Sequence, residues 1–219
     1  MLCPSATEAS GSCARSTNAP GRGLVCVMPC RLLCLFIFAA LTGCGEKNVP
    51  VSSAPPEIFT DATGHTWTPL APSGQKATVL LFLMHDCPVA NASAPELTRL
   101  ATGFSSRGVR FFGVYATETA AEILAHVRDY SLPFPGLLDP NLHLARSAGA
   151  TRVPEAAVYS PSGELLYRGR IDDRAVRSGV TRPEPQRRDL RLALEAILAG
   201  RQPDVKFTEA IGCWLPMAE

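Results

Sequence analysis

Apolar residues follow two different patterns along residues 57–200. Two runs, "ATVLLFLM" (77–84) and "VRFFGVYA" (109–116), are almost continuously apolar, which is typical of strands covered on both faces. The segment "IFTDATGHTWTPLA" instead alternates apolar and polar residues around "DATG", which predicts a β-hairpin. Two further segments, 155–160 and 164–170, flank "SPSG" and predict an antiparallel hairpin.

Helical spacing appears between and after these strands. "TAAEILAHVRDYSL" predicts a helix with Thr119 as its cap and Glu122 at the capping-box position. "NLHLARSAGA" predicts a short helix stopped by Gly149, and residues 187–199 predict a final amphipathic helix. The residues that recur at helical spacing after the first apolar run, up to Gly108, are Val89, Ser93, Leu97, Leu100 and Phe104.

This order of elements predicts one α/β domain over residues 57–200, with a central mixed sheet flanked by helices. An irregular tail, 201–219, follows and contains Cys213. A hydrophobic content of 46% and a charged content of 19% are ordinary for a globular protein. The net charge of +1 gives no reason to expect nucleic acid as a partner.

Residues 1–44 are interpreted as a targeting segment rather than as part of the fold. Arg31 precedes ten mostly apolar residues, "LLCLFIFAAL", and small residues follow, as in a secretory signal. Ten residues fall short of the roughly 20 that a spanning helix requires. "LTGC" (41–44) resembles the bacterial lipobox, which implies lipidation of Cys44. An ordinary cleaved signal and an uncleaved short anchor are the alternatives.

A lipidated Cys44 implies a membrane-anchored protein of the cell envelope that faces the periplasm or the exterior. Residues 45–56 are rich in Pro and Ser and suit a linker that holds the domain off the membrane. Residues 1–27 form an unusually long neutral leader, so Met28 is the more natural start of the chain.

Eight cysteines are present, and six of them lie in the first 44 residues. The domain and its tail therefore hold two, Cys87 and Cys213. In an exported chain, where disulfides persist, such a pair is either a structural staple or a redox couple. A tail can reach back over the domain, so Cys213 can serve as a resolving thiol, and Trp214 beside it is expected to anchor the tail by hydrophobic contact.

Cys87 is the residue of this sequence whose position most favours a reactive side chain. It follows a predicted strand, and Pro88 suits the first position of a helix, so free backbone N–H groups favour a thiolate there. His85 can stabilise that thiolate or, with Cys87, ligate a soft metal. No further ligand stands at a recognisable metal spacing, so we predict no metal. Asn91 either contacts the substrate or satisfies backbone groups at the helix start.

The motifs "DCPVANASAPEL", "VPEAAV" and "YRGRIDDR" resemble those of redoxins of the thioredoxin superfamily, a group related to AhpC/TSA proteins. The resemblance implies a thioredoxin-like fold with an N-terminal hairpin extension. It also implies that Cys87 is the nucleophile of a thiol-disulfide oxidoreductase. Val153-Pro154 stands where the superfamily has a cis-proline loop, which implies that Pro154 shapes the substrate groove.

Two departures from these relatives keep alternatives open. Ala90 replaces the second cysteine of Cys-x-x-Cys enzymes, and Leu80 and Met84 replace the proline and threonine of the peroxiredoxin motif. Arg152 is a candidate to supply a guanidinium near the site. The partner expected is a thiol or disulfide protein or a small-molecule oxidant. The alternatives are a peroxiredoxin-like peroxidase with an altered peroxide site and a non-catalytic module that binds copper or a partner. No nicotinamide, flavin or phosphate motif is visible, so we predict no organic cofactor.

Overall fold

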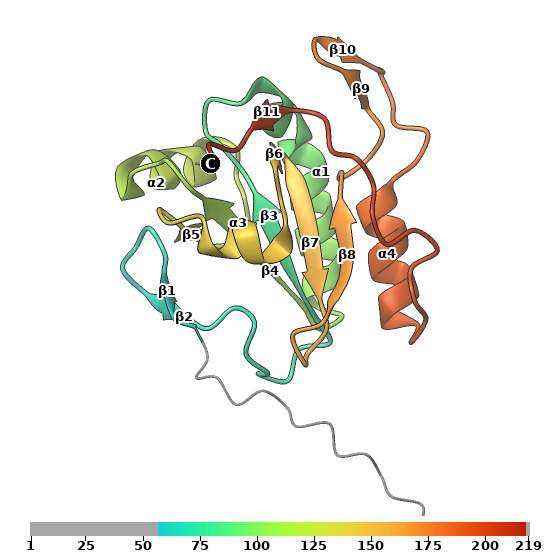
Figure 1. Cartoon of the computed structure of the whole chain (residues 1–219), viewed down its shortest axis with the longest axis horizontal. Coiled ribbons are helices and arrows are strands. Elements are labelled where there is room, and N and C mark those ends of the chain that lie inside the picture. Colours follow the sequence, from blue (N-terminus) through green and yellow to red (C-terminus); the bar gives the residue numbers. More distant parts are fainter. Residues whose placement is uncertain (1–56, 218–219) are drawn as a thin grey trace, which may run out of the picture. The chain divides into compact units, whose positions relative to one another are not determined.

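The computed structural model describes residues 57–217 (Figure 1). The predicted signal segment 1–44 with Cys44, and the linker 45–56, lie outside the described residues. The helices are α1 (Pro88–Ser105), α2 (Ala120–Asp129), α3 (His143–Ala148) and α4 (Asp189–Leu198). The strands are β1 (Phe59–Thr60), β2 (Thr66–Trp67), β3 (Ala77–Phe82), β4 (Val109–Tyr115), β5 (Gly136–Leu138), β6 (Arg152–Val153), β7 (Glu155–Tyr159), β8 (Leu165–Gly169), β9 (Ala175–Arg177), β10 (Val180–Thr181) and β11 (Cys213–Trp214).

A five-stranded mixed sheet in the order β5-β4-β3-β7-β8 forms the centre of the domain. β3, β4 and β5 are parallel, whereas β7 runs antiparallel to β3 and β8 antiparallel to β7. Every residue of β3 and β7 is buried, as expected for strands covered on both faces. The predicted mixed sheet and antiparallel hairpin are therefore confirmed.

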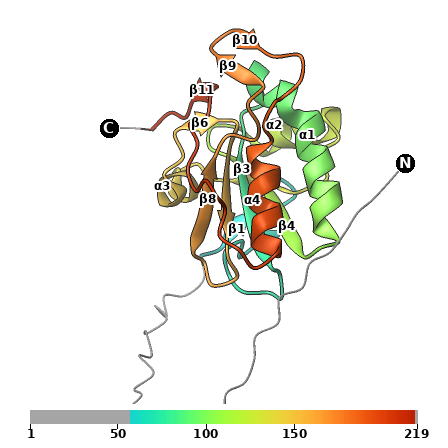
Figure 2. The same ribbon diagram turned by 90° about the vertical axis from the view of Figure 1, so that its right-hand side faces the viewer.

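Helices cover both faces of this sheet. α1 and α4 lie on one face and α3 lies on the other (Figure 2). Leu97, Leu100 and Phe104 of α1 are buried, as their helical spacing predicted. No helix within residues 57–217 combines the length and the apolar character needed to cross a membrane.

The predicted helix ends agree with the structure. Thr119 Oγ1 accepts a hydrogen bond from the Glu122 backbone N–H (3.3 Å), and the Glu122 carboxylate accepts one from the Thr119 N–H (2.8 Å). This reciprocal pair is a capping box, and it starts α2. Gly149 ends α3 with a φ of 69°, a left-handed conformation that favours glycine.

Two features of the fold differ from the prediction. The tail was expected to be irregular, but its residues Cys213 and Trp214 form β11, which pairs antiparallel with β6. A third hairpin, β9–β10, follows the central sheet and projects beyond it at the end where β11 lies (Figure 1). Strands of two or three residues carry too little pattern to be recognised from the sequence.

Candidate active site

Cys87 occupies the N-cap position of α1, with Pro88 inside the first turn as predicted. Its backbone is extended (φ −82°, ψ 113°), and its N–H donates to the Met84 carbonyl (3.3 Å). Cys87 therefore stands at the positive end of the helix dipole, but its side chain makes no hydrogen bond to the N–H groups of the first turn. The residue is only 1% exposed, so the sulfur is covered by other parts of the chain.

One side of this cover is the loop that contains the proline. The Val153–Pro154 peptide bond is cis, and the Cys87 sulfur lies 3.5 Å from the Val153 carbonyl oxygen. The buried Glu155 carboxylate accepts hydrogen bonds from the backbone N–H groups of Thr151 (3.0 Å) and Arg152 (3.2 Å). These contacts hold the loop against the cysteine.

The other side of the cover is the tail. Cys213 pairs with Val153 across β6–β11, and its sulfur lies 2.7 Å from the Cys87 sulfur. A Cβ atom on Gly212 would lie 1.8 Å from the Val153 carbonyl oxygen, so only glycine allows this close approach. The structure thus brings together two cysteines that are 126 residues apart in the chain.

Arg152 and Trp214 fasten the tail on its outer side. The Arg152 guanidinium lies 3.1 Å from the centroid of the Trp214 ring, and its Nη1 donates to the Gly212 carbonyl (3.2 Å). The sequence predicted that Trp214 anchors the tail by hydrophobic contact. Its side chain is instead 65% exposed, so it holds the tail through this cation–π contact. Arg152 is near the site, but its guanidinium is engaged with the tail.

The two thiols differ in their environment. Burial raises the pKa of the Cys213 thiol to about 11, and the hydrogen bond to Cys87 and the nearby charges of Cys87 and Asp86 act in the same direction. Cys213 therefore keeps its proton at neutral pH and donates it toward the Cys87 sulfur. Cys213 is therefore the protonated partner of the pair.

His85 lies against a buried carboxylate. Its Nδ1 lies 3.5 Å from Glu118 Oε1, and its backbone N–H donates to the same oxygen (3.1 Å). Asp86 joins them, so that potential ligand atoms of all three lie within 4.8 Å of one another. One imidazole and two carboxylates suit a hard divalent cation better than copper(I), and this cluster does not include Cys87.

A chain of hydrogen bonds runs behind the cysteine loop. Asn91 Nδ2 donates to the His85 carbonyl (2.9 Å), and Asn91 Oδ1 lies 2.9 Å from His126 Nε2. His126 Nδ1 in turn lies 2.8 Å from the Tyr115 hydroxyl. Because the Asn91 oxygen can only accept, His126 carries its proton on Nε2 and accepts from Tyr115. Asn91 thus holds the backbone before Cys87.

Burial keeps His126 neutral. It lowers the pKa of this imidazole, and the positive field of His85 adds to the effect, while Glu118 and Asp129 oppose it. Sequence reasoning missed both His126 and Tyr115, because a histidine inside a helical pattern gives no signal of its partner.

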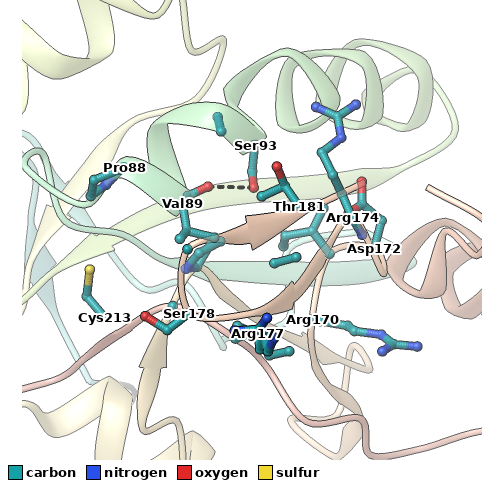
Figure 3. A pocket seen from close by; sticks show the side chains of 17 residues that line it. Pro88, Val89, Ser93, Arg170, Asp172, Arg174, Arg177, Ser178, Thr181 and Cys213 are labelled. Atoms are coloured by element: carbon teal, nitrogen blue, oxygen red, sulfur yellow. Dashed lines mark hydrogen bonds between the residues drawn. The ribbon is translucent and has the colours of Figure 1, made fainter. Parts of the chain in front are cut away.

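A pocket of about 410 Å³ opens beside the cysteines (Figure 3). It lies between the first turns of α1, the segment 170–181 and the end of the tail. Cys213 and Pro154 contribute to its wall, whereas Cys87 does not. This pocket could not be predicted from the sequence, because the segments that build it contact one another only in the folded chain.

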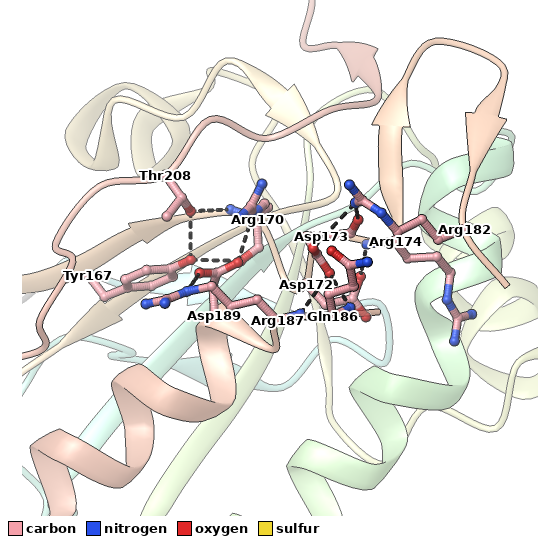
Figure 4. A network of polar contacts seen from close by, with 10 residues as sticks. All are labelled: Tyr167, Arg170, Asp172, Asp173, Arg174, Arg182, Gln186, Arg187, Asp189 and Thr208. Carbon is pink, nitrogen blue, oxygen red and sulfur yellow. Dashed lines mark hydrogen bonds and ion pairs between the residues drawn. The ribbon is translucent and has the colours of Figure 1, made fainter. Parts of the chain in front are cut away.

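An ion network fixes the segment that forms the outer wall of the pocket (Figure 4). Buried Asp189 binds Arg170 Nε and Arg187 Nε, each at 2.6 Å. Buried Asp173 accepts from the backbone N–H groups of Gln186 (2.7 Å) and Arg187 (2.9 Å). Both carboxylates of this network, Asp173 and Asp189, are buried.

Comparison with known proteins places this geometry in context. The model of the family described as AhpC/TSA matches residues 51–168, more than half of the chain. A solved structure of an uncharacterized conserved protein from Geobacillus kaustophilus is 26% identical, with a TM-score of 0.62 over 75% of this chain and 92% of that one. A hypothetical protein from Sinorhizobium meliloti 1021 is 24% identical, with a TM-score of 0.63 over 74% and 91%.

A third structure is similar over a shorter part of the chain. It is a secreted Mycobacterium tuberculosis disulfide oxidoreductase described as homologous to Escherichia coli DsbE, 24% identical, with a TM-score of 0.44 over 50% of this chain and 80% of that one. No sequence among curated proteins matches the chain. The family match and the first two structures confirm the predicted redoxin domain and its thioredoxin-like fold.

Proposed function

Because the chain belongs to the AhpC/TSA family of thiol-dependent oxidoreductases, we propose that it exchanges disulfides, with Cys87 as nucleophile and Cys213 as resolving thiol. The observation that carries this proposal is the distance of 2.7 Å between the two sulfurs. Reduction of a substrate disulfide needs one cysteine that attacks it and a second thiol close enough to resolve the mixed disulfide, and these two cysteines are in contact.

The chemistry balances with these two residues. The Cys87 thiolate attacks one sulfur of a substrate disulfide, the substrate S–S bond breaks, and one substrate thiolate leaves. Cys213 then gives up its proton and attacks the Cys87 sulfur of the mixed disulfide. The second substrate thiol leaves with a proton, and a Cys87–Cys213 disulfide remains. The substrate is reduced by two electrons and the protein is oxidised by two.

Disulfide exchange is favoured over peroxide reduction by two residues near the cysteine. Met84 has no hydroxyl that could donate to a bound peroxide, and the Arg152 guanidinium lies over Trp214. The proposal also requires the tail to open, because Cys87 is 1% exposed while Cys213 covers it. β11 pairs through two residues only, so its opening breaks few contacts.

The place of the protein in the cell is part of the same proposal. The signal-like residues 1–44 and the sequence "LTGC" support lipidation at Cys44 and attachment to a membrane of the cell envelope. A Cys44→Ser variant should lose incorporation of labelled fatty acid and move from the membrane fraction to the soluble fraction. Retention of the label would contradict lipidation at this residue.

The catalytic proposal is tested by turnover of the full chain. The wild type, Cys87→Ser and Cys213→Ser are each given dithiothreitol and either a peptide disulfide or hydrogen peroxide. We expect catalysed reduction of the peptide disulfide by the wild type and none by Cys87→Ser. When Cys213→Ser is given the peptide disulfide without dithiothreitol, a mixed disulfide should be trapped on Cys87. Faster turnover of peroxide would identify a peroxidase instead. If all three proteins give only the background rate, the protein is not a catalyst, and the alternative of a non-catalytic binding module is supported.

A further inference from the structure

The pocket beside the cysteines presents one sulfur and not the other. Cys213 is part of its wall, but the nucleophile Cys87 is not. A molecule in this pocket therefore meets Cys213 while the tail is closed. Apolar side chains form much of the remaining wall, among them Val89, Ile171 and Ile211. The volume of about 410 Å³ is that of a site for a small molecule.

Arginine side chains line the part of the pocket away from Cys213. Figure 3 shows Cys213 at one end, Arg174 and Asp172 at the other, and Arg177 between them. The pocket wall holds three arginines and one carboxylate, Asp172. Arg170 shares the Asp189 carboxylate with Arg187, each at 2.6 Å. The wall therefore has a surplus of positive charge.

Arg174 and Arg177 are the source of that surplus. Among the described residues, none of the ion pairs includes either of them. Within the same part of the chain, Arg174 Nε is buried and has no hydrogen-bond partner. Buried donors are normally satisfied, and a carboxylate is the acceptor that a guanidinium binds most strongly.

We propose that this pocket binds a small thiol that carries a carboxylate, with its sulfur at Cys213 and its carboxylate at Arg174 and Arg177, and that this thiol reduces the oxidised protein. The inference rests on the proposed function, because it concerns the Cys87–Cys213 disulfide. It names the class of reductant and the residue at which the reductant reacts.

Two molecules of the thiol complete the reduction. The first, as thiolate, attacks the Cys213 sulfur, the Cys87–Cys213 bond breaks, and its electron pair stays on Cys87 as a thiolate. A second thiolate attacks the bound thiol's sulfur, which releases Cys213 and forms the small disulfide. Cys213 then takes a proton from water, in accord with the burial that raises the pKa of its thiol. Cys87, at the helix start, is the better leaving group in the first step.

The test compares three thiols of different charge on the full chain. The protein is oxidised with diamide and mixed with 3-mercaptopropionate, 2-mercaptoethanol or cysteamine at equal thiolate concentration. After acid quenching and alkylation, peptide mapping by mass spectrometry follows loss of the linked Cys87 and Cys213 peptides. Each rate is divided by the rate of the same thiol with hydroxyethyl disulfide, which removes differences in intrinsic nucleophilicity.

We expect the normalised rate of 3-mercaptopropionate to exceed that of cysteamine by about tenfold, because a cleft of one charge sign concentrates its counter-ion. The double variant Arg174→Glu/Arg177→Glu should reverse this order. The control Arg107→Glu/Arg128→Glu changes the net charge by the same amount at residues outside the pocket wall. It should leave the order of the three normalised rates unchanged. The first mixed disulfide should be found on the Cys213 peptide.

Three results would contradict the inference about the pocket, and a fourth would also contradict the proposed function. Equal normalised rates, an unchanged order in the Arg174/Arg177 variant, or a mixed disulfide on Cys87 would each overturn the role of the pocket alone, provided that dithiothreitol still reduces the protein. If neither dithiothreitol nor any small thiol opens the linked peptides under native conditions, the proposed function itself fails.

Discussion

Cys213 lies directly opposite Val153 across the β6–β11 pair. Val153 precedes the cis proline, and its carbonyl oxygen lies 3.5 Å from the Cys87 sulfur. The pairing of β11 with β6 therefore places the Cys213 sulfur beside the Cys87 sulfur, with 2.7 Å between them. Because the strand is so short, the same contact that positions the resolving thiol can open to admit a substrate.

Loosening the tail should expose Cys87. Trp214→Ala removes the cation–π contact with Arg152, which is worth about 0.5–1 kcal/mol at an exposed site. The open population, and with it the alkylation rate of Cys87 under native conditions, should rise roughly two- to fivefold. Peptide mapping after timed treatment with iodoacetamide measures this rate.

A matched control lies on the same tail. Phe207 also contacts an arginine, Arg168 at 5.4 Å, but it is six residues before Cys213 and outside β11. Phe207→Ala should leave alkylation of Cys87 close to the wild-type rate. Equal acceleration by both substitutions would show that the tail opens as a whole, without a specific role of Trp214.

Gly212 is required for the close approach of the tail. In Gly212→Ala the new Cβ would lie 1.8 Å from the Val153 carbonyl oxygen, so β11 has to shift away from β6. Such overpacking costs about 1–3 kcal/mol, and the rate at which diamide forms the Cys87–Cys213 disulfide should fall at least about fivefold.

Gly103→Ala serves as the comparison for that substitution. Gly103 lies in α1, and a Cβ there meets nothing within 4 Å. It should stabilise the fold by about 0.5–1 kcal/mol and leave the disulfide rate unchanged. A normal disulfide rate in Gly212→Ala would show that the β6–β11 contact does not position Cys213.

Acid should destabilise the fold through His126. Burial lowers the pKa of this imidazole in the folded protein below its ordinary value of 6.5. The unfolded chain therefore binds the proton more tightly, unfolding takes up a proton, and the free energy of unfolding falls as pH drops below about 6.5. The contribution of neutral His126 to stability is fully present above that pH. It is lost as the pH falls toward the lower pKa that His126 has in the folded protein.

Urea unfolding between pH 7.5 and pH 5 measures how the free energy of unfolding changes with pH. This range extends about one unit above and about 1.5 units below the pKa of a free imidazole. His126→Gln should flatten this pH dependence, because an amide does not titrate and can still donate to Asn91. His65→Gln, at an exposed position, should retain it. A slope that persists in His126→Gln would assign the acid sensitivity to another group.

Local patterns predicted most of the fold. The apolar runs of β3 and β4, the reciprocal bonds of Thr119 and Glu122, and the turn at Gly149 each depend on residues close in sequence. Such features can be read from one segment at a time. The position of Cys87 before Pro88 likewise predicted a cysteine at a helix start.

Contacts between distant segments could not be predicted in this way. The pairing of Cys213 with Val153 spans 60 residues and involves strands too short to show a pattern. The partnership of His126 with Asn91 and the pocket arginines Arg174 and Arg177 depend on packing between separate elements. The site is therefore predicted as a nucleophile with a candidate partner, without the groups that position it.

The central claim, that Cys87 and Cys213 form a reversible redox couple, is tested most directly by a redox titration. The full chain is equilibrated in dithiothreitol buffers of graded oxidised fraction, quenched and alkylated, and the linked and alkylated peptides of Cys87 and Cys213 are quantified. The account predicts one disulfide between these residues, with the same midpoint from the oxidised and the reduced side. A pair that stays reduced, or a disulfide that opens only after denaturation, would contradict it.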